Sequence, residues 1–434
     1  MFKLLSVIFV LGVVFSGCSS TQPTSPQNEE VKKDLHNKKV FEQEDTLIMF
    51  ALRAEQLRDY KSAAVIFDGI YKKSEKKEYL YRSLQNMLVI KQNKEIIERV
   101  DSITKGKLDD FALIRIKIIA LIQLGEMNQA ELLAVSLVER SKEVDDYLLV
   151  SDIYIQEKKY DIAIKYLESA YYQDYNEKIL DKMSIILYVN LDRKKDAIAQ
   201  LETHSRVHGC SVVICKRLIA FYGNDNNLDG ILSAYLRVYK IDPSAENSLK
   251  IVQIYGYKKE FAKLIFFLED SKSDDETLLQ LYISAKDYKK AYKLAEKLYD
   301  ERGKVKFLGE SAIYQYESAK NRDDKKLLQE ISAKFDEVLQ EDRSTLYLNY
   351  YGYLLIDHDI DVNKGMKYVQ EALESEPDSA FYLDSLAWGY YKQGKCKDAL
   401  SIIKKVMTLE GGDDPEVLKH YKIIKKCKTK KGKK

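Results

Sequence analysis

Residues 380–400, AFYLDSLAWGYYKQGKCKDAL, decide the fold. Two segments with a helical spacing of apolar residues flank a short polar turn at Gly394. The first segment carries the small Ala387 with Tyr390 three residues later, and the second carries Ala399. A small residue lets two helices approach closely, and a neighbouring ring fills the groove beside it. The stretch therefore predicts two antiparallel helices that pack through Ala399.

The same spacing recurs along the chain, with a small or apolar anchor in each second helix. The anchors are Ala63, Ile97, Ala130, Ala163, Ala197, Ile231, Ala262, Ala291, Leu328, Gly365 and Ala399. Ten steps separate the first anchor from the last, about 33.6 residues each, and this resembles the tetratricopeptide repeat with its period of 34. The resemblance implies an all-α, right-handed superhelical solenoid of about eleven helix-turn-helix repeats over residues 39–410, with a concave inner wall.

The composition agrees with a helical array. The 434 residues include 18 Gly and 5 Pro, which is too few for the many turns of an all-β fold. A hydrophobic fraction of 45% supports a core and excludes global disorder. The net charge of +2 gives no electrostatic reason to expect nucleic acid as a partner.

A targeting segment precedes the repeats. After Lys3, the apolar run 4–15 is too short to cross a bilayer and is typical of a signal peptide. It ends in Phe15-Ser16-Gly17-Cys18, which resembles the lipobox of bacterial lipoproteins. The resemblance implies a signal peptide over 1–17 and acylation of Cys18, palmitate included. Because Ser19 and Ser20 follow rather than Asp, it also implies the outer membrane, on the periplasmic side. The alternative is an ordinary cleaved signal with an incidental cysteine.

Two more segments flank the repeats. The polar residues 18–38 predict a flexible tether between the lipid and the repeats. Residues 411–427 predict a helix that closes the array, with Asp413 or Asp414 as its cap and Pro415 in its first turn. The basic tail, 428–434, either touches anionic lipid or an acidic partner, or is a solvated end.

Four cysteines remain after Cys18, and an even number in an oxidising compartment predicts two disulfides. The closing helix should run parallel to the first helix of the last repeat. Its end at Cys427 would then return to the turn that holds Cys396, so we expect a Cys396–Cys427 disulfide.

The other two cysteines, Cys210 and Cys215, follow a non-helical His208-Gly209 entry that permits a local disulfide. Free thiols are one alternative. A zinc site with His204 and His208 is another, although its spacing matches no standard finger. Neither a phosphate-binding glycine loop, nor a His-Glu-x-x-His motif, nor a nucleophile elbow occurs. We therefore expect neither an enzyme nor a bound cofactor.

The first helix of each repeat lines the inner wall of tetratricopeptide arrays. In the last two repeats these helices carry a polar residue followed four later by an aromatic one, Asn349/Tyr353 and Asp384/Trp388. The polar group can hydrogen-bond a peptide while the ring packs on its side chain. Alternatively, Trp388 packs between repeats. The residues predicted to bind a partner are Asn349, Tyr353, Phe381, Asp384, Trp388 and Tyr391.

Residues 346–407 are similar to the end of long tetratricopeptide outer-membrane lipoproteins of Gram-negative bacteria. The match lies in Asn349, Gly352 and Tyr353, and then in residues 383–388, LDSLAW, where Ala387 replaces the glycine of that family. The family resemblance implies a non-catalytic adaptor that binds protein or peptide partners, because some members dock a periplasmic carboxyl-terminal processing protease and its cell-wall hydrolase substrates. The alternative is an assembly factor for outer-membrane protein insertion or for pilus or secretion machinery.

Overall fold

The computed structural model describes residues 39–107 and 109–427, which divide into two compact units on either side of the Gly209–Cys210 bond. Every regular element in these ranges is helical. The predicted signal peptide (1–17), Cys18 with its tether (18–38) and the basic tail (428–434) lie outside the described residues. Among the described helices, none combines the length and apolarity that a membrane-spanning segment requires.

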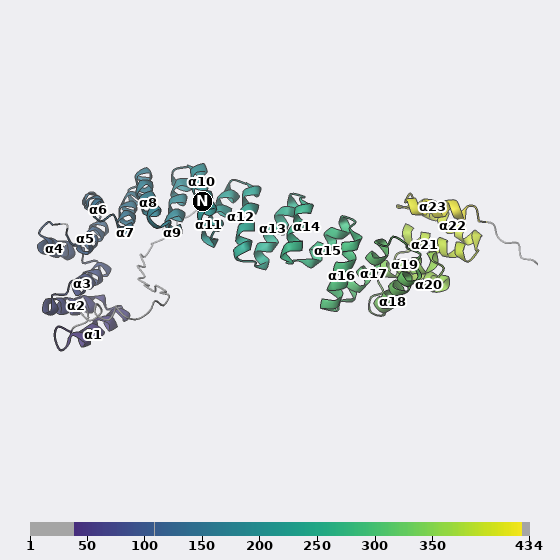
Figure 1. Cartoon of the computed structure of the whole chain (residues 1–434), viewed down its shortest axis with the longest axis horizontal. Coiled ribbons are helices and arrows are strands. Elements are labelled where there is room, and N and C mark those ends of the chain that lie inside the picture. Colours follow the sequence, from purple (N-terminus) through teal and green to yellow (C-terminus); the bar gives the residue numbers. More distant parts are fainter. Residues whose placement is uncertain (1–38, 108, 428–434) are drawn as a thin grey trace, which may run out of the picture. The chain divides into compact units, whose positions relative to one another are not determined.

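Unit 1 contains five helix pairs within its described residues (Figure 1). They are α1 (Glu44–Gln56) with α2 (Tyr60–Ser74), α3 (Lys77–Val89) with α4 (Asn93–Thr104), α5 (Phe111–Leu124) with α6 (Met127–Ser141), α7 (Val144–Gln156) with α8 (Tyr160–Asp174), and α9 (Glu177–Ile185), continued by the π-helical turn η1 (Ile186–Asn190), with α10 (Lys194–His208).

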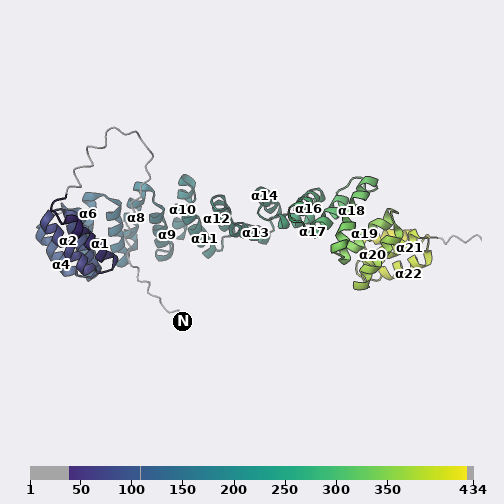
Figure 2. The same cartoon turned by 90° about the horizontal axis from the view of Figure 1, so that it is seen from below.

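Unit 2 contains six pairs and one closing helix within its described residues, and α20, α21 and α22 lie next to one another in both views (Figures 1 and 2). They are α11 (Val212–Asn224) with α12 (Leu228–Ile241), α13 (Ala245–Tyr257) with α14 (Phe261–Ser271), α15 (Asp275–Ser284) with α16 (Tyr288–Arg302), α17 (Val305–Glu317) with α18 (Lys325–Glu341), α19 (Thr345–Asp357) with α20 (Val362–Ser375), α21 (Ala380–Lys392) with α22 (Cys396–Val406), and finally α23 (Pro415–Ile424).

The two helices of each pair pack on each other, and within each unit each pair packs on the next, so both units are all-α arrays of tetratricopeptide-type repeats. The anchor is the fourth residue of every second helix, as at Ala63 and Ala399, both 0% exposed. Two predicted anchors, Ile97 and Ala262, are wrong. Ile96 and Leu264 occupy the anchor positions and are buried, because a branched side chain fills the groove there and the small Ala262 faces solvent.

The turn inside a pair follows one plan in ten of the eleven pairs. One residue of the turn adopts a left-handed conformation, with φ near +60° at Arg58 and Lys158 and +75° at Gly394; it is the second residue of the turn except between α5 and α6, where it is the first, Gly125. The backbone N–H of the next residue then bonds to a carbonyl of the first helix, as Lys395 N does to Tyr390 O at 2.9 Å. This short closed turn sets the second helix antiparallel to the first.

Glycine is required where α19 and α20 cross. A Cβ on Gly352 would lie 2.8 Å from the carbonyl oxygen of Gly365, and one on Gly365 would lie 2.5 Å from that of Gly352. Both distances are below ordinary van der Waals contact, so the two backbones approach as closely as hydrogen atoms permit.

In unit 1, buried acids fasten neighbouring repeats. Glu44 is 2% exposed and accepts hydrogen bonds from Lys76 Nζ at 2.7 Å, Tyr79 Oη at 2.7 Å and the Val40 amide at 2.6 Å. Burial alone would raise the pKa of Glu44, but these hydrogen bonds outweigh it and lower the pKa from 4.5 to about 2.

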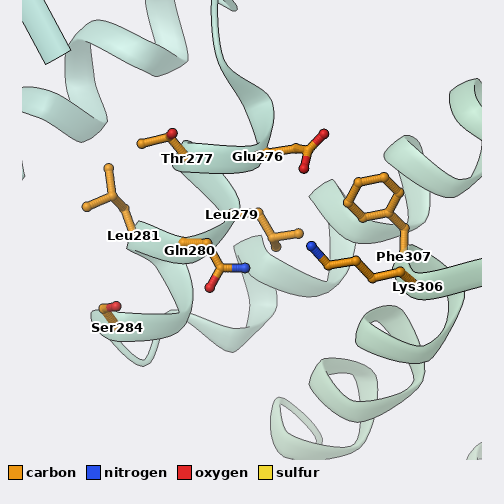
Figure 3. Close-up of a pocket in the computed structure, with 8 residues that line it drawn as sticks. All are labelled: Glu276, Thr277, Leu279, Gln280, Leu281, Ser284, Lys306 and Phe307. Carbon is orange, nitrogen blue, oxygen red and sulfur yellow. The ribbon is translucent and has the colours of Figure 1, made fainter. Parts of the chain in front are cut away.

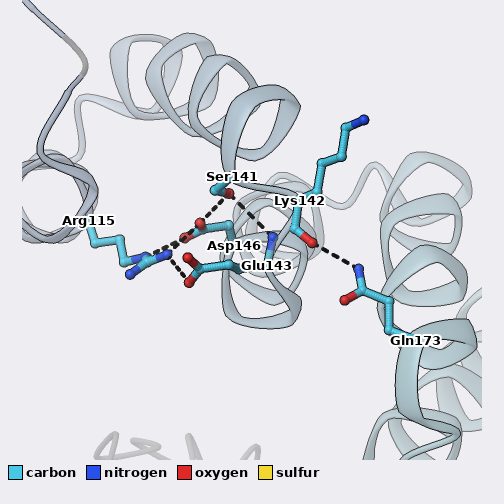
Figure 4. Close-up of polar contacts among 6 residues, drawn as sticks. All are labelled: Arg115, Ser141, Lys142, Glu143, Asp146 and Gln173. Carbon is cyan, nitrogen blue, oxygen red and sulfur yellow. Dashed lines mark hydrogen bonds and ion pairs between the residues drawn. The ribbon is translucent and has the colours of Figure 1, made fainter. Parts of the chain in front are cut away.

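A second buried acid in unit 1, Asp146 on α7, is 1% exposed. Arg115 of α5 holds it with two bonds, Nε to Oδ1 at 2.6 Å and a terminal nitrogen to Oδ2 at 2.7 Å (Figure 4). Ser141 also donates to Asp146, and Arg115 pairs with Glu143 as well. A two-pronged guanidinium bond of this kind fixes the angle between consecutive repeats.

Candidate partner-binding site

The first helices of the last two repeats, α19 and α21, bring the predicted residues together. The two helices pack on each other, and their equivalent positions are 35 residues apart in the sequence, so Asn349 corresponds to Asp384 and Tyr353 to Trp388. One turn earlier, Leu346 and Phe381 also correspond. Both are apolar and largely exposed, at 57% and 55%.

The closing helix α23 covers the C-terminal half of the same face, because it packs on both α21 and α22. Its N-terminus is capped by Asp414, which accepts a hydrogen bond from the Glu416 amide at 2.8 Å. Pro415 occupies the first position, where a missing N–H costs nothing. Its buried stripe consists of Val417, His420 and Ile424, each 1% exposed.

His420 is the centre of this contact. Its Nδ1 donates to Asp384 Oδ2 at 2.8 Å, and its ring stacks on the Trp388 indole with 4.2 Å between the ring centres. The Tyr353 ring lies 6.0 Å from the same imidazole. A single side chain of α23 therefore touches aromatic or acidic residues of both α19 and α21.

Two more hydrogen bonds complete the cluster. The Tyr353 hydroxyl donates to Glu416 Oε1 at 2.6 Å, which joins α19 to α23. The Trp388 indole N–H donates to Asp357 Oδ1 at 2.9 Å, which joins α21 to α19. Because an aromatic N–H or O–H seldom stays buried without a partner, these bonds explain why both rings tolerate their burial.

The electrostatics of the cluster leave two polar atoms unmatched within the described residues. Asp384 is 5% exposed; its Oδ1 atom is buried and has no hydrogen-bond partner. The Asn349 Oδ1 atom is buried and unpartnered as well. Burial raises the pKa of Asp384, and the hydrogen bond from His420 opposes that rise only in part.

The structure thus sorts the six predicted partner-binding residues by exposure. Phe381 is exposed, whereas Asp384 and Trp388 are buried beneath α23. The remaining three are half-buried, and Tyr391 stacks on Trp388 with 4.8 Å between ring centres. Trp388 also belongs to the core of the last two repeats, so it packs between repeats as the alternative interpretation expected.

Sequence reasoning missed His420 and Glu416. The available signal was the spacing of His420, three residues after Val417 and four before Ile424, which places it on the buried stripe of α23. A buried histidine in an apolar stripe needs a hydrogen-bond partner, and in this structure that partner is Asp384.

Both predicted disulfides are present in the structure. Cys396 and Cys427 are joined with 5.6 Å between their Cα atoms, which fastens the C-terminal end of α23 to the start of α22. Cys210 and Cys215 are joined as well, also with 5.6 Å between Cα atoms. Disulfide sulfurs are not thiolates, so the zinc alternative loses two of its four ligands.

The third of those ligand positions, His204, is engaged elsewhere. Its Nδ1 lies 2.7 Å from the Tyr171 hydroxyl and its Nε2 lies 3.3 Å from Glu177. Throughout residues 39–107 and 109–427, no group of three or more His, Cys, Asp or Glu side chains is arranged to hold a metal ion.

A small cavity of about 290 Å³ lies between α15 and α17, where Lys306 and Gln280 point toward one another (Figure 3). Glu276 lies at its rim and Leu279 and Phe307 form its apolar wall. Thr277, Leu281 and Ser284 complete its lining.

Comparisons with models of protein families and with curated proteins find no match. Many solved structures resemble the chain, and two of them align with most of its length. One is the APC/C hetero-tetramer Cut9–Hcn1, with 10% identity, a TM-score of 0.38, and coverage of 89% of this chain and 97% of that one. The other is Naa15/Naa10 bound to HypK-THB, with 13% identity, a TM-score of 0.29, and coverage of 87% and 65%. At these identities and scores neither resemblance identifies a function for this chain.

Proposed function

We propose that the chain is a non-catalytic scaffold that binds protein or peptide partners on the first helices of its repeats. In this proposal it is anchored by acylated Cys18 to the outer membrane and faces the periplasm. The observation that carries the binding role is the exposed pair Leu346 and Phe381, which lies at equivalent positions of α19 and α21 beside the aromatic cluster. Exposed apolar residues at equivalent positions of the last two repeats suit a ligand that lies across both repeats.

Crosslinking in cells, followed by purification in detergent, tests the binding role. The test variant is Leu346→Ser/Phe381→Ser. The matched control is Phe266→Ser, which removes an exposed phenylalanine from a second helix, α14, where the side chain is 74% exposed. We expect the same specific partner with the wild-type chain and the control, and at least a tenfold loss with the test variant. Equal recovery in all three would remove this face from the proposal.

The anchor is tested separately with Cys18→Ser. Metabolic labelling with palmitate should mark the wild-type chain and not the variant, and the variant should move from the outer-membrane fraction to the soluble periplasm. Label on the variant, or an unchanged fractionation, would contradict lipid anchoring. A deletion strain that lost many outer-membrane barrels or its pili would instead support an assembly factor.

A further inference from the structure

The contact between α23 and the last two repeats is unusual for a helix that merely closes an array. A closing helix needs only an apolar face toward the last repeat and a polar face toward water. Val417 and Ile424 supply that apolar face. In addition, α23 places Glu416 and His420 against Tyr353 on α19, one repeat further back.

The buried polar pair adds little as a stabilising device. Asp384 and His420 are both almost fully buried, and one oxygen of Asp384 remains without a partner. A buried ionic pair often gains no stability over an apolar pair of the same volume, and its best-attested use is to select one arrangement over another. The His420–Asp384 bond therefore points to recognition, in which one particular side chain is accepted at this place.

We propose that α23 is an internal ligand: it occupies the partner-binding face of α19 and α21 and can be displaced by a helix of a partner protein. The partner helix would imitate α23, with an acidic residue that accepts from Tyr353 and, four residues later, a histidine or arginine that bonds to Asp384 and lies flat on Trp388. This inference rests on the proposed scaffold function and gives the chemistry of its ligand.

The chemistry of the site supports that ligand. The rings of Tyr353 and Trp388 both lie against the imidazole that bonds to the buried Asp384 carboxylate. A planar donor such as imidazole or guanidinium can therefore stack on the indole while it donates to Asp384. The free Asp384 Oδ1 and the free Asn349 Oδ1 are two further acceptors. Arginine carries five N–H donors and could reach such acceptors, whereas the imidazole of His420 has only two ring nitrogens, which lie 2.8 Å from Asp384 Oδ2 and 3.5 Å from the Tyr353 hydroxyl.

In this proposal the Cys396–Cys427 disulfide controls how readily α23 detaches from α19 and α21. The N-terminal end of α23 is joined to α22 by the short turn 407–414, and the disulfide fixes its other end. With both ends held, α23 competes with any partner at the high effective concentration of an attached segment. When the disulfide is absent, α23 can swing out on the turn, and a larger fraction of the protein is ready to bind.

The test uses the full chain and a fluorescein-labelled peptide with the sequence of residues 412–426, followed by fluorescence polarisation. The double variant Cys396→Ser/Cys427→Ser should bind this peptide at least tenfold more tightly than the oxidised wild type. The matched control Cys210→Ser/Cys215→Ser removes the other disulfide and should bind as the wild type does. Wild-type protein reduced with dithiothreitol should behave like the first variant, and far-ultraviolet circular dichroism checks that the helices persist.

Two further measurements sharpen the result. A peptide with alanine in place of its histidine should bind the Cys396→Ser/Cys427→Ser variant at least tenfold more weakly, and one with arginine there should bind at least as tightly. Because Trp388 is the only tryptophan and is 8% exposed, its emission should shift to the red when α23 opens.

Either of two results would overturn the proposal: equal peptide affinity with and without the Cys396–Cys427 disulfide, or equal affinity of the histidine and alanine peptides. Such a failure would differ from failure of the scaffold function, because that function is tested on Leu346 and Phe381, one turn away from the residues that α23 buries.

Discussion

The glycine pair between α19 and α20 gives a quantitative test of how these repeats pack. In Gly365→Ala, the new methyl group would lie 2.5 Å from the carbonyl oxygen of Gly352 and 2.8 Å from Ile356 Cγ1. Ordinary contact begins at 3.4 Å, so the two helices must separate by about 0.9 Å, the difference between 3.4 and 2.5 Å. The oxygen belongs to the backbone of a helix and cannot rotate away.

The free energy of unfolding follows from two opposed effects. Overpacking costs about 1–3 kcal/mol, and a clash with helix backbone belongs at the upper end. Alanine in place of glycine inside a helix stabilises the folded state by about 1 kcal/mol. The net loss is therefore about 2 kcal/mol, which lowers the Tm of a unit of this size by about 4–8 °C.

Thermal unfolding followed by Trp388 fluorescence measures this change, since Trp388 belongs to the core cluster that α20, α21 and α22 share. The control is Gly256→Ala in the same unit, where nothing lies within 4 Å of the added methyl group. We expect its Tm to rise by about 2–4 °C through helix propensity alone. A Tm for Gly365→Ala equal to or above that of the wild type would refute the close packing.

The remaining predictions concern buried groups. The pKa of Glu44 is lowered from 4.5 to about 2, so its contribution to the free energy of unfolding is complete above pH 4.5. That contribution, about 3 kcal/mol, is lost as the pH falls toward 2. Glu44→Gln should remove this part of the pH dependence in urea titrations of unit 1. Arg115→Leu should cost about 3–5 kcal/mol because it strands the carboxylate of Asp146, and the double variant Arg115→Leu/Asp146→Leu should recover most of that loss in the same titration. Phe335→Ala should lower the free energy of unfolding by about 3–5 kcal/mol, because the ring is 0% exposed and stacks on Tyr351 with 5.1 Å between ring centres. Phe266 is exposed, so Phe266→Ala should change it by less than about 0.5 kcal/mol. Chemical denaturation compares the two variants.

The repeat pattern could be predicted from sequence because each helix pair obeys the same local constraint. A small or apolar anchor at the fourth residue of the second helix packs against the first helix, and that constraint repeats at a nearly fixed interval. The two misplaced anchors, Ile97 and Ala262, lie where neighbouring residues were equally plausible: two isoleucines are adjacent at 96–97, and a leucine takes the anchor place in the short helix α14. Local spacing cannot choose between such neighbours; packing against the adjacent repeat does.

The Cys396–Cys427 disulfide was also within reach of sequence reasoning, because the direction of a closing helix follows from the alternation of helices before it. The burial of Asp384 and Trp388 could not be predicted from the sequence in this way. It depends on where α23 packs, and α23 places Glu416 and His420 as far back as Tyr353. These contacts join residues more than sixty positions apart, and no periodicity in the sequence records them.

The left-handed turns inside the helix pairs have a consequence for engineering. Eight of the ten place a residue other than glycine at a positive φ, lysine at positions 91, 158, 259 and 286 among them. A side chain in that conformation costs about 1 kcal/mol that glycine would not. Because each repeat in such an array contacts only its neighbours, a change in one turn acts mainly on its own repeat and the two beside it. Exchanging one lysine for glycine would stabilise a single turn without changing any helix face. A set of such exchanges would decide which repeat unfolds first on heating.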